Sequence, residues 1–185
     1  MERDGALALL RRHVSSENMI KHCLASEAVM KALADRLGQD RELWGLAGLL
    51  HDVDVELTAG DISRHTHEAE QLLRASGLPE RLIEAVNLHN EAAHPGQKRA
   101  GLFHHALAAA ETVTGLITAT ALVYPDRKLA SVKTSSVVKR MKDKRFAASV
   151  DRSIILECER LGLKLDEFVE LALCAMRGIA AELGL

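Results

Sequence analysis

An adjacent histidine and aspartate, His51 and Asp52, end an apolar stretch of the chain, LWGLAGLL over residues 43–50. The stretch is expected to lie in the core, so the dipeptide at its end is expected to be buried too. Removing a carboxylate from water costs several kcal/mol unless a cation or a hydrogen-bond donor receives it. A metal ion would satisfy both side chains, because imidazole and carboxylate are both metal ligands. If a metal does so, the rest of the chain has to supply further ligands.

The remaining sequence is typical of an all-α protein. Hydrophobic residues make up 48% of the 185 residues and aromatic residues only 3%, and few runs alternate between polar and apolar. Capping residues and apolar spacing predict helices over residues 4–13, 17–37, 40–51, 61–76, 79–90, 106–123, 131–141, 151–161 and 165–183. At this length, and without an internal repeat, a single domain over residues 1–185 is expected.

Charge and cysteine content argue against several classes of protein. A net charge of −2 gives no reason to expect nucleic acid as a partner. The three cysteines form no CxxC pair, so neither a disulfide framework nor a cysteine zinc site is expected, and a cytoplasmic location fits best. The first residues lack the features of a signal peptide, and Glu111 interrupts the most apolar stretch, so no membrane span is expected. A homo-oligomer is compatible with the sequence.

Further candidate ligands lie on or beside the predicted helices, namely His22, His65 or His67, His89 and Glu111. With His51 and Asp52 they form a set of nitrogen and oxygen donors, which suits Fe, Mn, Co, Ni or Zn better than Ca. Helices that each contribute one ligand can converge inside a bundle. A lone histidine on an apolar face is more often a hydrogen-bonded core residue. The ordered set therefore indicates a metal site more strongly than any one member does.

This order of residues resembles the HD superfamily of metal-dependent phosphohydrolases, in particular its small members with an HDIG motif. The similarity lies in an early histidine, the doublet in LLHDVDVE, a following histidine, a histidine in VNLHN and an acidic residue in AAETVTGLI, which are His22, His51 with Asp52, His65, His89 and Glu111. Residues 120–152 are also similar to the extension of those small proteins. The resemblance implies an HD-domain helical bundle, with the metal-site core over about 18–125 and additional C-terminal helices over about 126–185.

The resemblance also implies roles for these residues. His22, His51, Asp52 and the acidic residue would bind one ion, and His65 and His89 would bind a second. Asp52 would bridge the two ions and act in catalysis. One or two divalent transition-metal ions would activate water for attack on a phosphoester. The expected enzyme is a phosphatase or phosphodiesterase acting on a small phosphorylated or nucleotide substrate.

The sequence departs from the family pattern in two places. The last ligand is usually aspartate, whereas this chain has Glu111, whose longer side chain can still reach a metal. Val53 and Asp54 stand where the HDIG motif has isoleucine and glycine. Asp54 is interpreted as a loop residue or a hydrogen-bond acceptor beside the site, not as a ligand. His67 is the alternative to His65 and is expected to be exposed.

Other interpretations of the same residues remain open. Some relatives with both additional histidines hold a di-iron centre that oxidises a C–H bond with O₂. A displaced Glu111 would instead favour a non-catalytic module that senses a nucleotide or a metal. The basic stretch from Lys128 to Arg145 could receive a phosphate-rich substrate or RNA, but its interleaved apolar residues favour a solvated helix face. His104 is expected to be a surface or packing residue.

Overall fold

The structure is a computed structural model that describes residues 1–185, and all of its regular secondary structure is helical. The α-helices are α1 (Arg3–His13), α2 (Glu17–Leu37), α3 (Arg41–Leu50), α4 (His67–Ala75), α5 (Glu80–His89), α6 (Leu102–Leu122), α7 (Thr134–Arg140), α8 (Arg152–Ile155), α9 (Leu165–Gly178) and α10 (Ala180–Leu183). Three short 3₁₀ helices, η1 (Glu91–Ala93), η2 (Leu129–Ser131) and η3 (Leu156–Leu161), lie between them. The all-α class predicted from the sequence is confirmed.

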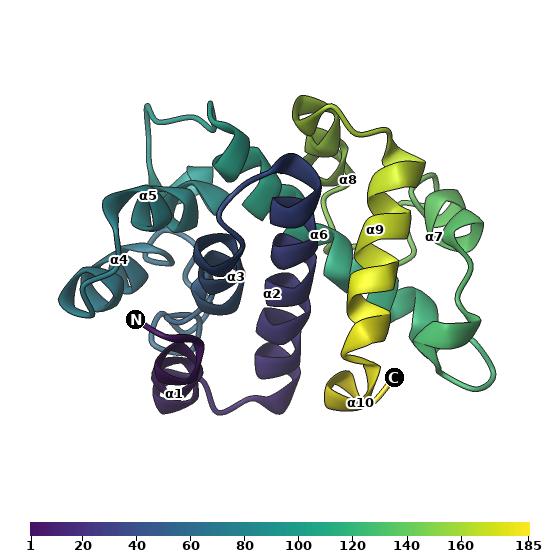
Figure 1. Cartoon of the computed structure of the whole chain (residues 1–185), viewed down its shortest axis with the longest axis horizontal. Helices are drawn as coiled ribbons and strands as arrows, with labels where there is room; N and C mark the ends of the chain where they lie inside the picture. Colours follow the sequence, from purple (N-terminus) through teal and green to yellow (C-terminus); the bar gives the residue numbers. More distant parts are fainter.

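The two 21-residue helices, α2 and α6, organise the bundle. Figure 1 shows α1, α3, α4 and α5 on one side of α2, and α7 and α9 on the other, while α6 runs behind α2 and α9. Ser16 caps α2 by accepting a hydrogen bond from the amide of Met19, and Gly38 ends the helix in the left-handed conformation at φ 64°. Most of α6 is buried, which explains why its sequence is apolar on every face.

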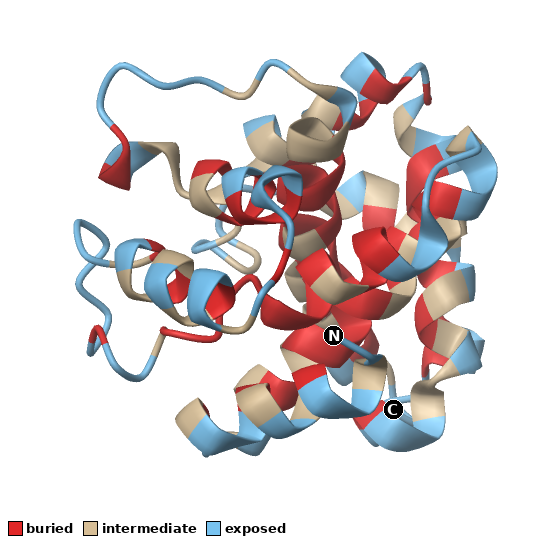
Figure 2. Ribbon diagram, turned by 60° about the vertical axis from the view of Figure 1, so that its left-hand side comes forward, coloured by how far each residue is buried: buried red, intermediate tan, exposed pale blue.

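One hydrophobic cluster of buried residues extends along the chain from Ala6 to Leu183. Its members come from both sides of α2, and buried segments fill the centre of the bundle in Figure 2. Phe168 on α9 and Leu10 on α1 are among its largest fully buried side chains. None of the helices has the length and hydropathy needed to cross a bilayer.

Helices α2 and α3 pack so closely at Gly48 that no side chain separates their backbones. A Cβ atom at Gly48 of α3 would lie 2.6 Å from the carbonyl oxygen of Ser26 and 2.8 Å from the amide nitrogen of Glu27, both on α2. Only glycine fits such a contact without movement of one helix. The approach brings His22 on α2 close to His51 at the end of α3.

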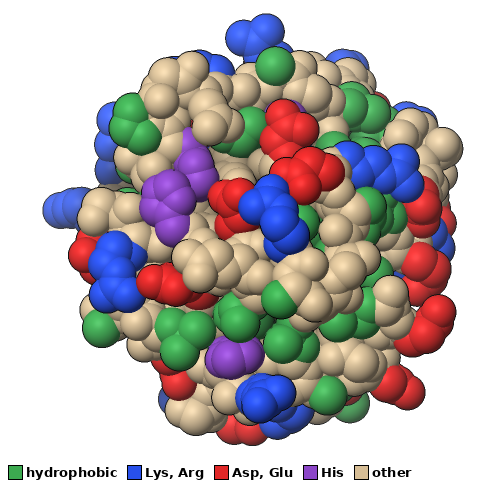
Figure 3. Space-filling view, turned by 90° about the vertical axis from the view of Figure 1, so that its left-hand side faces the viewer, with side chains coloured by type: hydrophobic (Ala, Val, Ile, Leu, Met, Phe, Trp, Pro, Cys, Tyr) green, Lys and Arg blue, Asp and Glu red, His purple; other side chains and the backbone are tan.

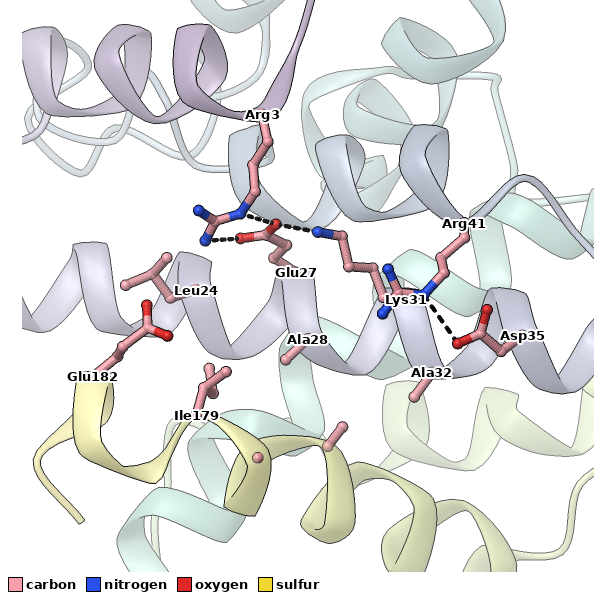
Figure 4. A pocket seen from close by; sticks show the side chains of 12 residues that line it. Arg3, Leu24, Glu27, Ala28, Lys31, Ala32, Asp35, Arg41, Ile179 and Glu182 are labelled. Atoms are coloured by element: carbon pink, nitrogen blue, oxygen red, sulfur yellow. Dashed lines mark hydrogen bonds and ion pairs between the residues drawn. The ribbon is translucent and has the colours of Figure 1, made fainter.

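A buried carboxylate joins α1 to α2 away from the predicted ligands. Glu27 accepts two hydrogen bonds from the guanidinium of Arg3, at 2.6 and 2.9 Å, and one from Lys31 at 2.7 Å (Figure 4). The hollow beside it has a volume of about 390 Å³ and extends to Ile179 and Glu182. Because Glu27 has both cations as partners, its charge is satisfied within the fold.

Several predicted helices have different bounds in the structure. The helix predicted from Asp61 begins at His67, because Asp61 caps only the local turn at Ser63 and Thr66 has a positive φ of 83°. The predicted helix 165–183 breaks at Ile179, where α9 gives way to α10. The predicted helix 131–141 is shortened to α7, which ends at Arg140, and the basic residues that follow lie in turns. Their interpretation as a helix face is therefore wrong.

Candidate metal centre

The predicted ligands converge from five parts of the chain. They are His22 on α2, His51 and Asp52 directly after α3, His65 before α4, His89 at the end of α5, and Glu111 in the middle of α6. The side chain of His51 is fully buried, and those of Asp52 and His89 are 12% and 7% exposed. The contact of α2 with α3 and the packing of α5 on α6 hold these side chains together.

Two histidines lie on one side of Asp52. The Nε2 atoms of His22 and His51 are 3.1 Å apart. Oδ2 of Asp52 lies 3.7 Å from the first and 3.4 Å from the second. Three donor atoms of different residues thus surround one small space.

Two other histidines lie on the other side of Asp52 in the same arrangement. The Nε2 atoms of His65 and His89 are also 3.1 Å apart. Oδ1 of Asp52, the carboxylate oxygen not used by the first group, lies 3.1 Å from the first and 3.5 Å from the second. Asp52 is therefore shared by two groups of donors, with one oxygen directed to each.

In each of the four imidazoles Nδ1 has a hydrogen-bond partner, and this contact orients Nε2 toward Asp52. The Nδ1 atoms of His51 and His89 lie 2.9 and 2.6 Å from the carbonyl oxygens of Gly48 and Val86, which can only accept. Nδ1 of His22 lies 3.0 Å from the hydroxyl of Thr114, which donates its own hydrogen to the carbonyl of Glu111. Each Nδ1 therefore carries a hydrogen, and Nε2 is free to act as a ligand.

Asp54 fixes the fourth imidazole. Its Oδ1 accepts a hydrogen bond of 2.7 Å from Nδ1 of His65, and its Oδ2 accepts from the backbone amides of Thr66 and Ala69 at 2.8 and 2.9 Å. Its side chain is fully buried. Burial opposes ionisation, but these hydrogen bonds outweigh it and lower the pKa of Asp54. Asp54 is thus an acceptor beside the site, as interpreted from the sequence.

The four imidazoles divide into two that are held neutral and two that favour the charged form. Burial lowers the pKa of His22 to about 4, and it also lowers the pKa of His89. Burial acts in the same direction on His65, but hydrogen bonds to two carboxylates outweigh it and raise the pKa of His65 to about 10. The charge of Asp52 likewise outweighs burial at His51 and raises its pKa.

The buried donor set therefore requires positive charge. Each Nε2 pair consists of one imidazole that favours a proton and one that does not, so each pair can share one proton. Although burial favours the neutral acid, the neighbouring imidazoles hold the pKa of Asp52 well below its usual range. A divalent cation between each pair would replace the shared proton, with two nitrogens and one oxygen as ligands. The residues present thus fit two transition-metal ions.

Glu111 lies at the edge of the first group of donors. Its Oε2 is 4.0 Å from Nε2 of His22, and its Oε1 is 2.5 Å from the hydroxyl of Thr112. Burial raises the pKa of Glu111 to about 7, although the charge of His51 opposes this shift. A cation between Glu111 and His22 would favour the ionised carboxylate.

The pH dependence of stability tests how Glu111 is held. A raised folded-state pKa contributes stability that is complete below the ordinary value of 4.5 and is lost as the pH rises through about 7. In a chelator, we expect the unfolding free energy of wild type, relative to Glu111→Gln, to fall between about pH 5 and about pH 8. With saturating Mn²⁺ the decline should disappear. Urea unfolding of both proteins at about pH 5 and about pH 8 measures this decline. If the difference in unfolding free energy between wild type and Glu111→Gln is the same at both pH values in chelator, the prediction is contradicted.

The site opens to the surface through a hollow of about 240 Å³. His22, Glu111 and Gly115 line it, together with Val150 and Asp151 from the segment before α8. The two halves of the bundle thus meet at the mouth of the site. No motif in the sequence indicated that the C-terminal half would cover it.

The remaining histidines lie outside both groups of donors. His67 is exposed, as predicted, and its Nε2 lies 2.9 Å from the carbonyl of Ala93. His104 lies 3.9 Å from Glu84 and belongs to neither group. His94, to which the sequence assigned nothing, is buried and lies 2.7 Å from the hydroxyl of Thr66.

A half-buried ion pair that sequence reasoning missed supports α5 from outside. The guanidinium of Arg99 forms hydrogen bonds of 2.7 to 3.1 Å with Glu157 of η3 and donates to the carbonyl of Leu88 at 2.8 Å. His105 shares Glu157 at 2.6 Å. The pair joins residues far apart in the sequence, so neither periodicity nor motif spacing could reveal it.

Comparison with known families and proteins is consistent with this geometry. The HD domain family matches residues 19–120, which is more than half of the chain and includes every predicted ligand. Ribonuclease Y of Aquifex aeolicus is 32% identical over 76 residues, which are 41% of this chain and 14% of that protein. Ribonuclease Y of Opitutus terrae is 26% identical over 87 residues, which are 47% of this chain and 17% of that protein. The chain thus matches less than a fifth of the length of either protein.

A solved structure shares the fold over nearly the whole chain. It is the crystal structure of the HD domain of the L. monocytogenes phosphodiesterase PgpH in complex with cyclic-di-AMP. The superposition covers 95% of this chain and 96% of that one, with a TM-score of 0.56 and 13% sequence identity. At this identity, the similarity concerns the fold alone.

Proposed function

Because this chain belongs to the HD domain family, we propose that it is a metal-dependent phosphohydrolase with a two-ion site. The observation that carries the proposal is the pair of 3.1 Å contacts between Nε2 atoms, one on each side of Asp52. Such contacts between ring nitrogens are unfavourable without a proton or a cation between them. The preference of one imidazole in each pair for the charged form supports the same conclusion.

The proposal gives each residue a role. Asp52 would bridge two ions, with His22, His51 and Glu111 at the first and His65 and His89 at the second. Divalent ions in such a pair lower the pKa of water and neutralise charge on a phosphoryl oxygen. Asp52 would also orient the attacking water, since no other carboxylate faces both groups of donors. The substrate would be a small phosphomonoester or phosphodiester that enters through the hollow between α6 and Val150.

Metal analysis and a substrate panel test the proposal together. Purified protein should contain up to two equivalents of transition metal, and with Mn²⁺ or Co²⁺ it should release phosphate or cleave a diester from a panel of nucleotides and nitrophenyl esters. Absence of stoichiometric metal and of hydrolysis across the panel would reject it. Bound nucleotide that survives incubation with metals would support a sensing module instead.

The same donors could hold two iron ions, and this favours a second candidate function, oxidation with O₂. The observation behind it is the second donor group, His65 and His89, because two ions can share Asp52. Anaerobic loading with iron followed by exposure to O₂ separates the two functions. An O₂-dependent change in the visible spectrum, with loss of a C–H bond in an added substrate, would favour the oxygenase.

Asp54 is expected to control the second ion selectively. Asp54→Asn removes the charge that orients His65 but leaves His22 and His51 unchanged. Loss of a carboxylate behind a ligating histidine commonly lowers metal affinity by about 10–100-fold. Calorimetric titration with Mn²⁺ should therefore show a normal first binding step and a weakened second one. The control is Asp61→Asn, because Asp61 is an exposed aspartate of the same loop whose side chain accepts hydrogen bonds only from Ser63. Equal weakening of both steps would contradict this role.

A further inference from the structure

The segment from the last turn of α7 to the start of α8, residues 139–151, is the most basic part of the chain, and we refer to it as the basic strap. It contains five cations and two carboxylates in a protein whose net charge is −2. The five are Lys139, Arg140, Lys142, Lys144 and Arg145, and none of them forms a salt bridge. The strap lies outside the region that matches the HD domain family.

The two carboxylates of the strap do not neutralise these cations. Asp151 caps α8 by accepting from the amide and hydroxyl of Ser153 at 2.8 and 2.5 Å. Asp143 accepts from the backbone amide of Arg145 at 3.1 Å. The other side of the molecule, which carries α4 and α5, differs, because acidic and basic side chains are mixed there (Figure 3).

The strap has a defined shape because Arg152 holds it. The guanidinium of Arg152 donates to the carbonyl oxygens of Asp143, Phe146, Ala147 and Val150. These hydrogen bonds hold the backbone of residues 143–150 around the Arg152 side chain. The exposed lysines are therefore presented on an ordered loop, which lowers the entropic cost of binding a ligand.

The strap leads directly to the mouth of the site. Val150 and Asp151 line the hollow that contains His22 and Glu111. The same two residues line a neighbouring hollow of about 310 Å³, which Lys144 also lines. A third hollow, of about 530 Å³, is lined by Lys139, Arg140, Lys142, Asp143 and Phe146. Lys144 thus lines a hollow that shares Val150 and Asp151 with the opening of the candidate metal centre, and three further cations of the strap line a separate hollow.

We propose that the basic strap binds a chain of phosphates, one of which occupies the candidate metal centre while the others lie along the strap. This inference rests on the proposed phosphohydrolase function and extends its substrate from a small phosphoester to a molecule that carries several phosphates in sequence. Unpaired cations on an ordered loop suit such a ligand, whereas a single phosphate would fill only the mouth. Phe146 lies under Arg140, with the guanidinium 4.5 Å from the ring, so the strap offers phosphate contacts and no free stacking platform.

Binding without turnover tests the strap. In the Asp52→Asn background, the probes are a labelled single-stranded oligonucleotide and inorganic polyphosphate, and the variant is Lys142→Gln/Lys144→Gln/Arg145→Gln. Loss of three phosphate contacts should weaken binding about tenfold or more and lower the slope of log Kd against log salt by about 2. The matched control, Arg12→Gln/Arg36→Gln/Lys98→Gln, removes the same charge from exposed positions elsewhere and should change the slope little.

The outcomes separate the strap from the catalytic proposal. Weaker binding of either probe by the strap variant than by the control variant supports the proposal, and the probe affected identifies which phosphate chain the strap binds. Equal affinities and salt slopes for the two triple variants would overturn it. With Asp52 intact, the strap variant should lose less activity toward bis(p-nitrophenyl) phosphate, which carries one phosphate, than toward the oligonucleotide or polyphosphate. If the wild type hydrolyses no phosphoester, the proposed function fails, while the binding comparison still decides whether the strap receives phosphates.

Discussion

Asp52→Asn is expected to abolish both metal binding and hydrolysis. Asparagine preserves the shape of the side chain but removes the charge between the two groups of donors, and its amide nitrogen cannot act as the second bridging oxygen. We expect less than one bound equivalent of metal and a fall in kcat/KM of at least about a thousandfold, equivalent to about 4 kcal/mol of transition-state stabilisation. Elemental analysis and initial rates with Mn²⁺ measure the two effects.

The interpretation of this result requires a folded variant and a control. Asp35→Asn changes an aspartate on α2, the helix of His22, that is exposed and paired with Arg41 at 3.0 Å. It should retain metal and activity. A cooperative unfolding transition of Asp52→Asn would show that the loss does not come from unfolding. Two bound ions and wild-type rates in Asp52→Asn would refute the bridging role.

Gly48→Ala is expected to be the most destabilising of the conservative substitutions. The added Cβ would meet backbone atoms of Ser26 at 2.6 and 2.7 Å, and the backbone of a packed helix cannot move aside as a side chain can. Overpacking of this kind costs about 1–3 kcal/mol, occasionally more. In a chain of this size, such a loss lowers Tm by roughly 2–4 °C per kcal/mol. The carbonyl oxygen of Gly48 also accepts a hydrogen bond from Nδ1 of His51, a proposed metal ligand, so the affinity for metal should fall as well.

Gly45→Ala is the matched control on the same helix. A Cβ at Gly45 would meet atoms of the Lys31 side chain at 2.5 to 3.2 Å, and this side chain can shift, although the shift would disturb its hydrogen bond to Glu27. Both substitutions gain the same intrinsic preference for the helix, about 1 kcal/mol. Gly45→Ala should therefore cost clearly less stability than Gly48→Ala, because only a side chain has to move. If thermal unfolding shows equal effects at the two glycines, the close approach of α2 and α3 does not limit stability.

The helical part of the fold could be predicted because it depends on local signals. The N-cap at Ser16, the stop at Gly38 and the apolar spacing of α2 and α3 determine where those helices lie. The start of α4 could not be predicted, because the carboxylate that binds the amides of Thr66 and Ala69 belongs to Asp54, more than ten residues earlier. A cap supplied from such a distance leaves no pattern within the helix itself.

The sequence by itself determined which residues could form the site: the doublet His51–Asp52, three further histidines in order, and a carboxylate on α6. Donor chemistry and helical periodicity, which are local properties, identify these residues as candidates, and the resemblance to the HD superfamily favours His65 over His67. Only the tertiary structure decided that each oxygen of Asp52 faces its own pair of histidines, that Glu111 lies at the edge, and that the basic strap borders the mouth. These relations depend on how helices pack, and packing is set by contacts between residues distant in the chain, such as Gly48 with Ser26.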